Sequence, residues 1–375
     1  MTDLPRTVAP AALSTTAALL FVQPTTLCNL DCSYCYLPDR ARARTMPAEV
    51  ADAVATGVRR WADRHPVHVL WHGGEPLTVG PARFERLLDR FRAATPHPVT
   101  HGVQTNATLI DDSWCELFTR RAVHVSVSLD GPQGRNAARV DRAGRDSTAR
   151  ALDGIRALRT HGIPFSAIAV APRPSAAAAR ELYDWFAELG CTSLGVNLVE
   201  RKGVHVRTEV ARDAQVVDFW AALTARTESD GRLRIRDIDH ALRFVRRALT
   251  PAGAPPVGRP YPLSPMVAWN GDVTPIGPEL AGFSSPDHGR FTVGNVLDGG
   301  LAEVTARARH VPWVAEAMRG VSACRAQCEH FAFCGGGNPA NKYFETGRFD
   351  VTETAHCRAG RKALMEGMLH HVAQG

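Results

Sequence analysis

Short runs of apolar and β-branched residues alternate along the chain with longer segments that have an amphipathic helical pattern. The short runs predict strands at residues 18–23, 67–71, 99–104, 123–129, 165–170 and 193–199. The longer segments predict helices at residues 47–63, 81–94, 111–120, 147–161, 175–189 and 213–228. Such alternation is typical of an α/β fold with a parallel sheet, either open or curved into a barrel.

The pattern changes after residue 231. Residues 232–247 predict one more helix, and the six prolines of residues 250–265 indicate a bridge between domains. Residues 266–375 contain short strand-like runs, many glycines and four cysteines, and Asn270-Gly271 predicts a tight primed turn in a hairpin at 269–273. We therefore expect a flexible tail at 1–15, a barrel domain at 16–231, a bridging helix and linker at 232–265, and a C-terminal domain at 266–375.

Composition is ordinary for a soluble globular protein, with 45% hydrophobic and 22% charged residues. No apolar run is long enough to span a bilayer, and residues 17–22 lack the flanking features of a signal peptide. The net charge of +6 is spread out and forms no basic stripe interleaved with aromatic residues. We expect a cytoplasmic protein with no nucleic acid or membrane partner.

Polar motifs follow the carboxyl ends of five predicted strands. In parallel α/β domains the loops at this edge form the functional site. Any one motif is weak evidence, because Asn106 or Asp130 alone would more often be a turn or cap residue. Five motifs at one edge predict a site, and they are the cysteine loop 28–35, the loop 72–76, Gln104-Thr105-Asn106, Ser128-Leu129-Asp130-Gly131, and residues 197–200.

Seven of the nine cysteines form two clusters, which are Cys28, Cys32 and Cys35, and Cys324, Cys328, Cys334 and Cys357. Cys115 and Cys191 are predicted to be buried apolar residues. Structural zinc needs four ligands, and a 4Fe–4S cluster usually takes four thiolates. Three thiolates would leave one iron open for chemistry. Zinc with a distant fourth ligand such as His72 stays an alternative at this point.

Residues 28–35 resemble the cysteine signature of radical S-adenosylmethionine (SAM) enzymes, and Gly73-Gly74-Glu75-Pro76 resembles their GGEP motif. The resemblance covers the chain from about residue 18. It implies a partial (β/α)6 TIM barrel, a 4Fe–4S cluster on Cys28, Cys32 and Cys35, and reductive cleavage of SAM to a 5′-deoxyadenosyl radical. The implied SAM-binding residues are Tyr34, Gly73, Gly74, Glu75, Asn106, Ser128, Asp130 and Arg139.

The C-terminal cysteines resemble the SPASM domain, the auxiliary-cluster module of radical SAM peptide maturases. Two cysteines of that pattern are absent, because Ile276 follows residues 271–275 and Asn338 follows the glycine run. The resemblance then implies a degenerate, twitch-like domain with one auxiliary 4Fe–4S cluster on Cys324, Cys328, Cys334 and Cys357. The sulfatase-maturating branch carries an aspartate base where this chain has Gly277, which disfavours formylglycine formation.

Residues 334–357 resemble the maturases that form cyclophanes in ribosomal peptides, as do residues 197–205. This implies hydrogen abstraction from a Cβ of a precursor peptide, a bond to an aromatic ring carbon, and an electron donor such as flavodoxin or ferredoxin. Glu279 is the candidate base for the ring proton, although a solvated loop carboxylate is an equal alternative.

Two other functions stay open. One is a different radical SAM peptide modification, such as thioether formation, epimerisation or residue oxidation. The other is a zinc-stabilised peptide-binding protein without catalysis.

Overall fold

The protein is described by a computed structural model that covers residues 11–132, 134–200, 202–205, 213–250 and 259–374. In these residues nine strands form one sheet with the order β7-β6-β5-β4-β3-β2-β1-β8-β9, in which β9 alone is antiparallel to its neighbour. The strands are β1 (Leu19–Val22), β2 (Val67–Trp71), β3 (Val99–Thr105), β4 (Val123–Ser128), β5 (Phe165–Ala171), β6 (Ser193–Leu198), β7 (Arg234–Ile235), β8 (Met266–Val267) and β9 (Val273–Thr274).

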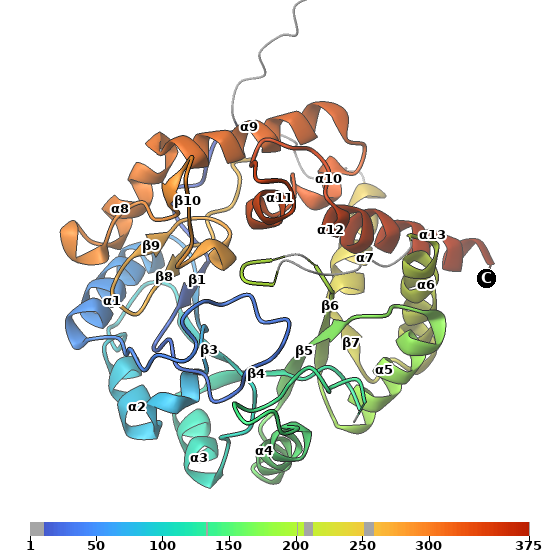
Figure 1. The fold of residues 1–375 in the computed structure, drawn as a ribbon, viewed down its shortest axis with the longest axis horizontal. Helices are drawn as coiled ribbons and strands as arrows, with labels where there is room; N and C mark the ends of the chain where they lie inside the picture. The colour runs from blue at the N-terminus through green and yellow to red at the C-terminus, as the bar shows by residue number, and fades with distance from the viewer. Residues whose placement is uncertain (1–10, 133, 201, 206–212, 251–258, 375) are drawn as a thin grey trace, which may run out of the picture.

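The sheet curves into an incomplete barrel with helices along its outer side (Figure 1). Alternate residues explain this layering: in β2, Val67, Val69 and Trp71 are buried, and the residues between them are only partly covered. The main hydrophobic core therefore lies between the sheet and its outer helices. These are α1 (Ala48–Ala62), α2 (Pro81–Asp89), α3 (Asp112–Arg121), α4 (Thr148–Thr160), α5 (Ala176–Glu188) and α6 (Asp213–Asp230). The α/β partial-barrel prediction is confirmed.

The C-terminal region (residues 266–374) closes the open side of the barrel arc (Figure 1). Its strands β8 and β9 extend the sheet beyond β1, and β10 (Ser284–Ser285) pairs with β11 (Gly289–Arg290). A second hydrophobic cluster, around Trp313 and Phe349, fills this region. Its helices are α8 (Leu301–Arg307), α9 (Pro312–Gln327), α10 (Phe331–Cys334), α11 (Pro339–Thr346), α12 (Ala355–Cys357) and α13 (Ala363–Gln374).

Some local predictions were wrong. The predicted helix 232–247 begins only at α7 (Arg236–Ala248), because residues 234–235 pair with β6 as β7. The hairpin has no primed turn: Gly271 has a φ of +91°, whereas Asn270 has none of the positive φ that a type I′ turn requires. Much of 266–375 is helical rather than made of short strands.

The ends of the predicted domains are only partly within the described residues. Of the predicted tail, residues 1–10 lie outside them, whereas the N–H of Ala11 donates to Met318 O at 3.3 Å. Residues 251–258 of the proline-rich linker also lie outside them. Among the described helices, none is long and apolar enough to cross a membrane.

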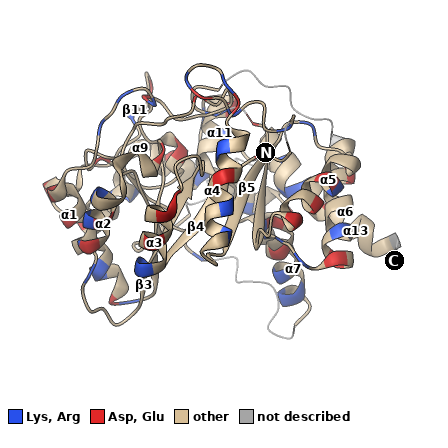
Figure 2. Ribbon diagram, turned by 90° about the horizontal axis from the view of Figure 1, so that it is seen from below, with Lys and Arg blue, Asp and Glu red and all other residues tan. Residues whose placement is uncertain are grey.

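Positively and negatively charged residues are interspersed along the outer helices (Figure 2). Several form exposed ion pairs between helices, such as Arg90 with Asp52 at 2.9 Å and Arg120 with Glu85 at 3.1 Å. Part of the positive charge on these helices is therefore neutralised by neighbouring carboxylates.

Candidate active site

The N-terminal cysteine loop (residues 28–35) follows β1 at the carboxyl edge of the sheet. Its backbone is tied to the segment after β4, since the N–H of Asp31 donates to Val140 O at 2.8 Å. The Arg142 guanidinium donates to Cys28 O at 2.8 Å. Burial, followed by the charge of Glu75 and the neighbouring thiols, raises the pKa of Cys28 to about 12.

The three thiols share this loop, and Cys32 and Cys35 act electrostatically on Cys28. Within the described residues, no group of three or more His, Cys, Asp or Glu side chains is arranged to hold a metal ion. The donor set nevertheless fits an iron–sulfur cluster, since three neighbouring thiols on one loop are ligands of that chemistry.

The loop 73–76 follows β2 and packs directly on the chain that leads to the cysteines. Gly74 has a φ of +65°, and a Cβ there would lie 2.6 Å from Leu27 O. Only glycine fits this approach. Glu75 is 1% exposed, and its carboxylate accepts from Thr105 Oγ1 at 2.8 Å and from the Asn106 N–H at 2.7 Å. Burial outweighs these hydrogen bonds and raises the pKa of Glu75 to about 7.

Glu75 therefore joins the loop after β2 to the end of β3. Asn106, whose backbone N–H donates to Glu75, also donates from its side-chain Nδ2 to Asn29 Oδ1 in the cysteine loop, at 2.9 Å. Ser128, at the end of β4, accepts from Gln104 Nε2 at 2.8 Å. Glu75 and Asn106 are thus linked to each other and to the cysteine loop, and Ser128 is linked to the end of β3 through Gln104.

Arg139, Asp130 and Tyr34 form a second polar group, the Arg139 cluster. Arg139 and Asp130 are an ion pair at 3.0 Å, with side chains 8% and 2% exposed. The Tyr34 hydroxyl donates to Asp130 Oδ2 at 2.5 Å, and the guanidinium lies 5.4 Å from the centre of the Tyr34 ring. Arg139 Nε is buried and has no partner among the described residues. A buried donor without an acceptor fits a ligand that brings oxygen atoms, such as a carboxylate or ribose.

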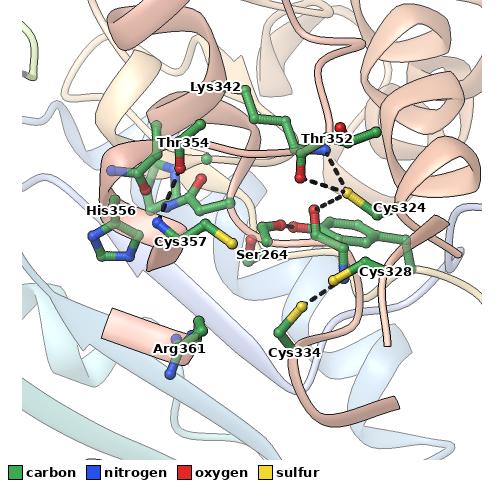
Figure 3. A pocket seen from close by; sticks show the side chains of 17 residues that line it. Ser264, Cys324, Cys328, Cys334, Lys342, Thr352, Thr354, His356, Cys357 and Arg361 are labelled. Atoms are coloured by element: carbon green, nitrogen blue, oxygen red, sulfur yellow. Dashed lines mark hydrogen bonds between the residues drawn. The ribbon is translucent and has the colours of Figure 1, made fainter. Parts of the chain in front are cut away.

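The C-terminal cysteines line a cavity of about 250 Å³, the four-cysteine cavity (Figure 3). Cys324 and Cys328 come from the end of α9, Cys334 from the end of α10 and Cys357 from α12. Burial, and then the charge of its neighbours Cys334 and Cys328, raises the pKa of Cys357 to about 11, although Lys362 opposes this. The sequence predicted these four cysteines as one ligand set, and the structure places them around one cavity.

A lysine also lines the four-cysteine cavity (Figure 3). Lys342 is 3% exposed, and its Nζ donates to Cys324 Sγ at 3.5 Å. A buried ammonium is unfavourable without a negative partner. Four thiolates in a metal–sulfur cluster would supply that negative charge, so this donor set fits such a group.

A partly buried ion network lies at the edge of the same cavity. Lys202, after β6, pairs with Glu279 at 2.7 Å and with Glu200 at 3.2 Å, and the three side chains are 14–15% exposed. Glu279 also accepts from Asn338 Nδ2 at 3.2 Å. Glu200 pairs with His356 at 2.9 Å. Asn338 and His356 both line the four-cysteine cavity, so the network borders it.

The network also reaches the N-terminal cysteine loop. Lys202 Nζ lies 5.3 Å from the centre of the Tyr36 ring, and Tyr36 follows Cys35 directly. The Tyr36 hydroxyl is 3.0 Å from Nε2 of His72, whose pKa burial lowers to about 4. The ion network (Glu200, Lys202, Glu279) therefore lies between the two cysteine sites.

Burial would raise the pKa of Glu279 and of Glu200. The Lys202 ammonium outweighs this effect, lowering the pKa of Glu279 below its usual range and, together with His356, that of Glu200 to about 2. Both carboxylates are therefore ionised at neutral pH.

Sequence reasoning missed Lys202 and Lys342 as site residues. Lys202 lies two residues after Glu200, just beyond the polar motif 197–200 at a predicted strand end, so its position was a usable signal. Lys342 carries no such signal, because only tertiary packing buries it.

Comparison with known proteins identifies the family. Residues 22–186 match the Radical SAM superfamily. An uncharacterised protein of Synechocystis is 30% identical over 356 residues, which is 91% of this chain and 88% of that protein. The chain belongs to the radical SAM superfamily, whose members use a 4Fe–4S cluster and SAM, and it is an enzyme.

Other relatives are maturases. The serine-type anaerobic sulfatase-maturating enzyme of Klebsiella aerogenes is 30% identical over 228 residues, or 57% of this chain and 55% of that enzyme. The chain thus spans about half of that relative's length.

Solved structures share the fold. anSMEcpe with bound AdoMet aligns with a TM-score of 0.72 at 22% identity, covering 95% of this chain and 98% of that chain. Streptococcus suis SuiB bound to precursor peptide SuiA aligns with a TM-score of 0.63 at 17% identity, covering 92% and 76%.

Proposed function

We propose that this enzyme modifies a ribosomally made precursor peptide by joining an aromatic ring carbon to the Cβ of a nearby residue, which gives a cyclophane. The observation that carries the proposal is the ion network between the two cysteine sites. Such a crosslink requires hydrogen abstraction at one place and removal of an electron and a proton at another, which suits two metal sites with an ionised carboxylate between them.

We assign the SAM-binding cluster to Cys28, Cys32 and Cys35, and one auxiliary 4Fe–4S cluster to Cys324, Cys328, Cys334 and Cys357. When bound, these groups supply a 5′-deoxyadenosyl radical that takes a hydrogen atom and an acceptor for the electron that the ring releases. Arg139, with its unpaired Nε, would bind a SAM oxygen, and Gly73 and Gly74 would admit the ligand close to the backbone.

Glu279 would take the ring proton. A ring that has gained a bond and lost an electron is a strong carbon acid, so a carboxylate with a lowered pKa is a sufficient base. Lys202 keeps Glu279 ionised and fixes its direction through the 2.7 Å ion pair. The charge of Glu279 also acts on Tyr36, beside Cys35, and on Tyr261, which lines the four-cysteine cavity.

Formylglycine formation is the second candidate, because sulfatase-maturating enzymes are among the relatives. Position 277 argues against it. Gly277 has a φ of +61°, and a Cβ there would lie 3.1 Å from Ala340 Cβ and 3.2 Å from its N. An aspartate at this position would be strained, and the nearby carboxylate is instead Glu279.

The test is co-expression with a short peptide encoded near the gene, chosen for repeated aromatic-x-x patterns. A crosslink removes two hydrogens, and the joined segment then gives no internal fragments in tandem mass spectrometry. Epimerisation leaves the mass unchanged. A product that loses two hydrogens but reacts with a hydrazide probe is an aldehyde, and it would replace the crosslink proposal with residue oxidation. A sulfur-to-carbon bond would indicate a thioether.

We further propose that reduced flavodoxin or ferredoxin supplies the electron and that the reaction takes place in the cytoplasm. SuiB binds its precursor peptide in a structure of the same fold, which supports a peptide partner here.

A further inference from the structure

Lys342 has an unusual electrostatic position. It lies on α11, whose first turn is capped by Asn338, the same residue that donates to Glu279. The side chain is buried, and its Nζ contacts Cys324 Sγ at 3.5 Å. Cys324 otherwise contacts backbone carbonyls, with Thr352 O at 3.2 Å from its Sγ.

No carboxylate pairs with Lys342 among the residues that the structure describes. The nearby acidic residues are engaged elsewhere: Glu345 accepts from the N–H groups of Ala355 and His356, and Glu353 pairs with Arg358 and Lys362. The ammonium therefore depends on sulfur for its counter-charge. A neutral thiol is a weak acceptor, whereas a metal-bound thiolate is a strong one.

We propose that Lys342 raises the reduction potential of the auxiliary cluster by holding a positive charge and an N–H donor against the Cys324 ligand. Reduction adds one negative charge to a cluster, and a buried cation nearby stabilises that charge. Hydrogen bonds to the sulfurs and net charge are known determinants of such potentials. The proposal rests on the auxiliary cluster of the proposed function but not on the identity of the peptide product.

The consequence is that the electron and the proton released by the ring have separate acceptors. An auxiliary cluster held by the four cysteines would accept the electron that the ring releases when it regains aromaticity, and Lys342 would make that cluster the better acceptor. The proton goes to Glu279 in the same step, so electron and proton leave the substrate toward neighbouring groups.

The experiment compares Lys342→Met, Lys342→Gln and Lys342→Arg in a full-length Cys28→Ala/Cys32→Ala/Cys35→Ala background, where only the auxiliary cluster can assemble. The control is Lys362→Met, which removes an equal charge that is 33% exposed and paired with Glu353. The readouts are iron content and the midpoint potential from a dye-mediated titration followed by EPR. Neither readout depends on crosslinking.

The expected result is a more negative midpoint potential in Lys342→Met and Lys342→Gln, an almost unchanged potential in Lys342→Arg, and a smaller shift in Lys362→Met. Loss of iron from both neutral variants, with iron retained in Lys342→Arg, would also support a required positive charge. An unchanged potential in iron-loaded neutral variants would overturn the proposal. So would loss of iron from Lys342→Arg, which would assign the residue a packing role.

Discussion

The two cysteine sites of this protein are built differently. The N-terminal cysteine loop presents three thiols from one continuous segment, held by backbone hydrogen bonds and by Arg142. The four-cysteine cavity gathers its thiols from α9, α10 and α12, which are separate helices. With a cluster bound, three ligands on a short loop would leave one metal position free, whereas four ligands from a folded scaffold would complete the coordination.

The two sites also differ in the partner of their buried cation. At the N-terminal site the buried cation, Arg139, already has a carboxylate partner in Asp130, and its buried Nε has no partner among the described residues. At the C-terminal site the buried cation, Lys342, contacts a cysteine sulfur directly. The first arrangement suits an exchangeable ligand, and the second suits a permanent anionic group.

The largest expected effect comes from removing one cysteine at each site. Cys35→Ala should abolish 5′-deoxyadenosine release, because the first cluster loses a ligand. Cys334→Ala should still release 5′-deoxyadenosine but form no crosslinked peptide. Chromatography of the nucleoside and mass spectrometry of the peptide measure the two outcomes. Full crosslinking by Cys334→Ala would show that the C-terminal cysteines are not required for the crosslink.

The next effect concerns the ion network between the sites. Glu279→Gln should retain 5′-deoxyadenosine release and lower the crosslinking rate by roughly 10²- to 10⁴-fold, the range expected for loss of a general base. Glu303→Gln, at an exposed carboxylate paired with Arg307, is the matched control. An undiminished crosslinking rate in Glu279→Gln would exclude Glu279 from the mechanism.

A smaller effect is expected at the Arg139 cluster. Asp130→Asn leaves the buried Arg139 charge unpaired, which should destabilise the fold by about 3–5 kcal/mol and weaken SAM binding. Denaturant unfolding and the SAM dependence of 5′-deoxyadenosine release measure these changes. Tyr34→Phe, which removes only the hydroxyl bonded to Asp130, should cost about 1 kcal/mol. Unchanged SAM dependence in a folded Asp130→Asn variant would contradict a role for this cluster in binding.

The last effect is a pH dependence of the folding stability that arises from Glu200. Its pKa is lowered from 4.5 to about 2, so the ion pairs stabilise the folded protein fully above about pH 5 and progressively less as pH falls toward 2. The loss amounts to about 3 kcal/mol. The stability difference between the wild type and Glu200→Gln should therefore shrink between pH 6 and pH 3 in paired unfolding experiments. A difference that does not vary with pH would show that Glu200 has no depressed pKa.

The sequence located most of the barrel because its signals are local. Strands such as β2 and β5 are short apolar runs, and the polar motifs follow their ends directly. The two-residue strand β7 lies inside a helix-like pattern and depends on pairing with β6, which no local window reveals. The short helices of the C-terminal region are likewise stabilised by tertiary packing rather than by an amphipathic pattern in their own sequence.

The site shows the same difference between local and tertiary signals. Cysteine spacing and strand-end motifs identify candidate ligands, because the chemistry of these residue types is restrictive. The burial of Lys202 and Lys342 is a property of the fold, since a lysine in sequence is most often a solvated side chain.

The most direct test of the account is EPR of the reduced, anaerobically reconstituted protein with and without SAM. The Cys28→Ala/Cys32→Ala/Cys35→Ala variant should hold about four irons, with a signal that SAM does not change. The Cys324→Ala/Cys328→Ala/Cys334→Ala/Cys357→Ala variant should also hold about four irons, with a signal that shifts when SAM is added. A SAM-dependent signal in the first variant, or its absence in an iron-loaded second variant, would contradict the assignment of the open site to the N-terminal cysteine loop.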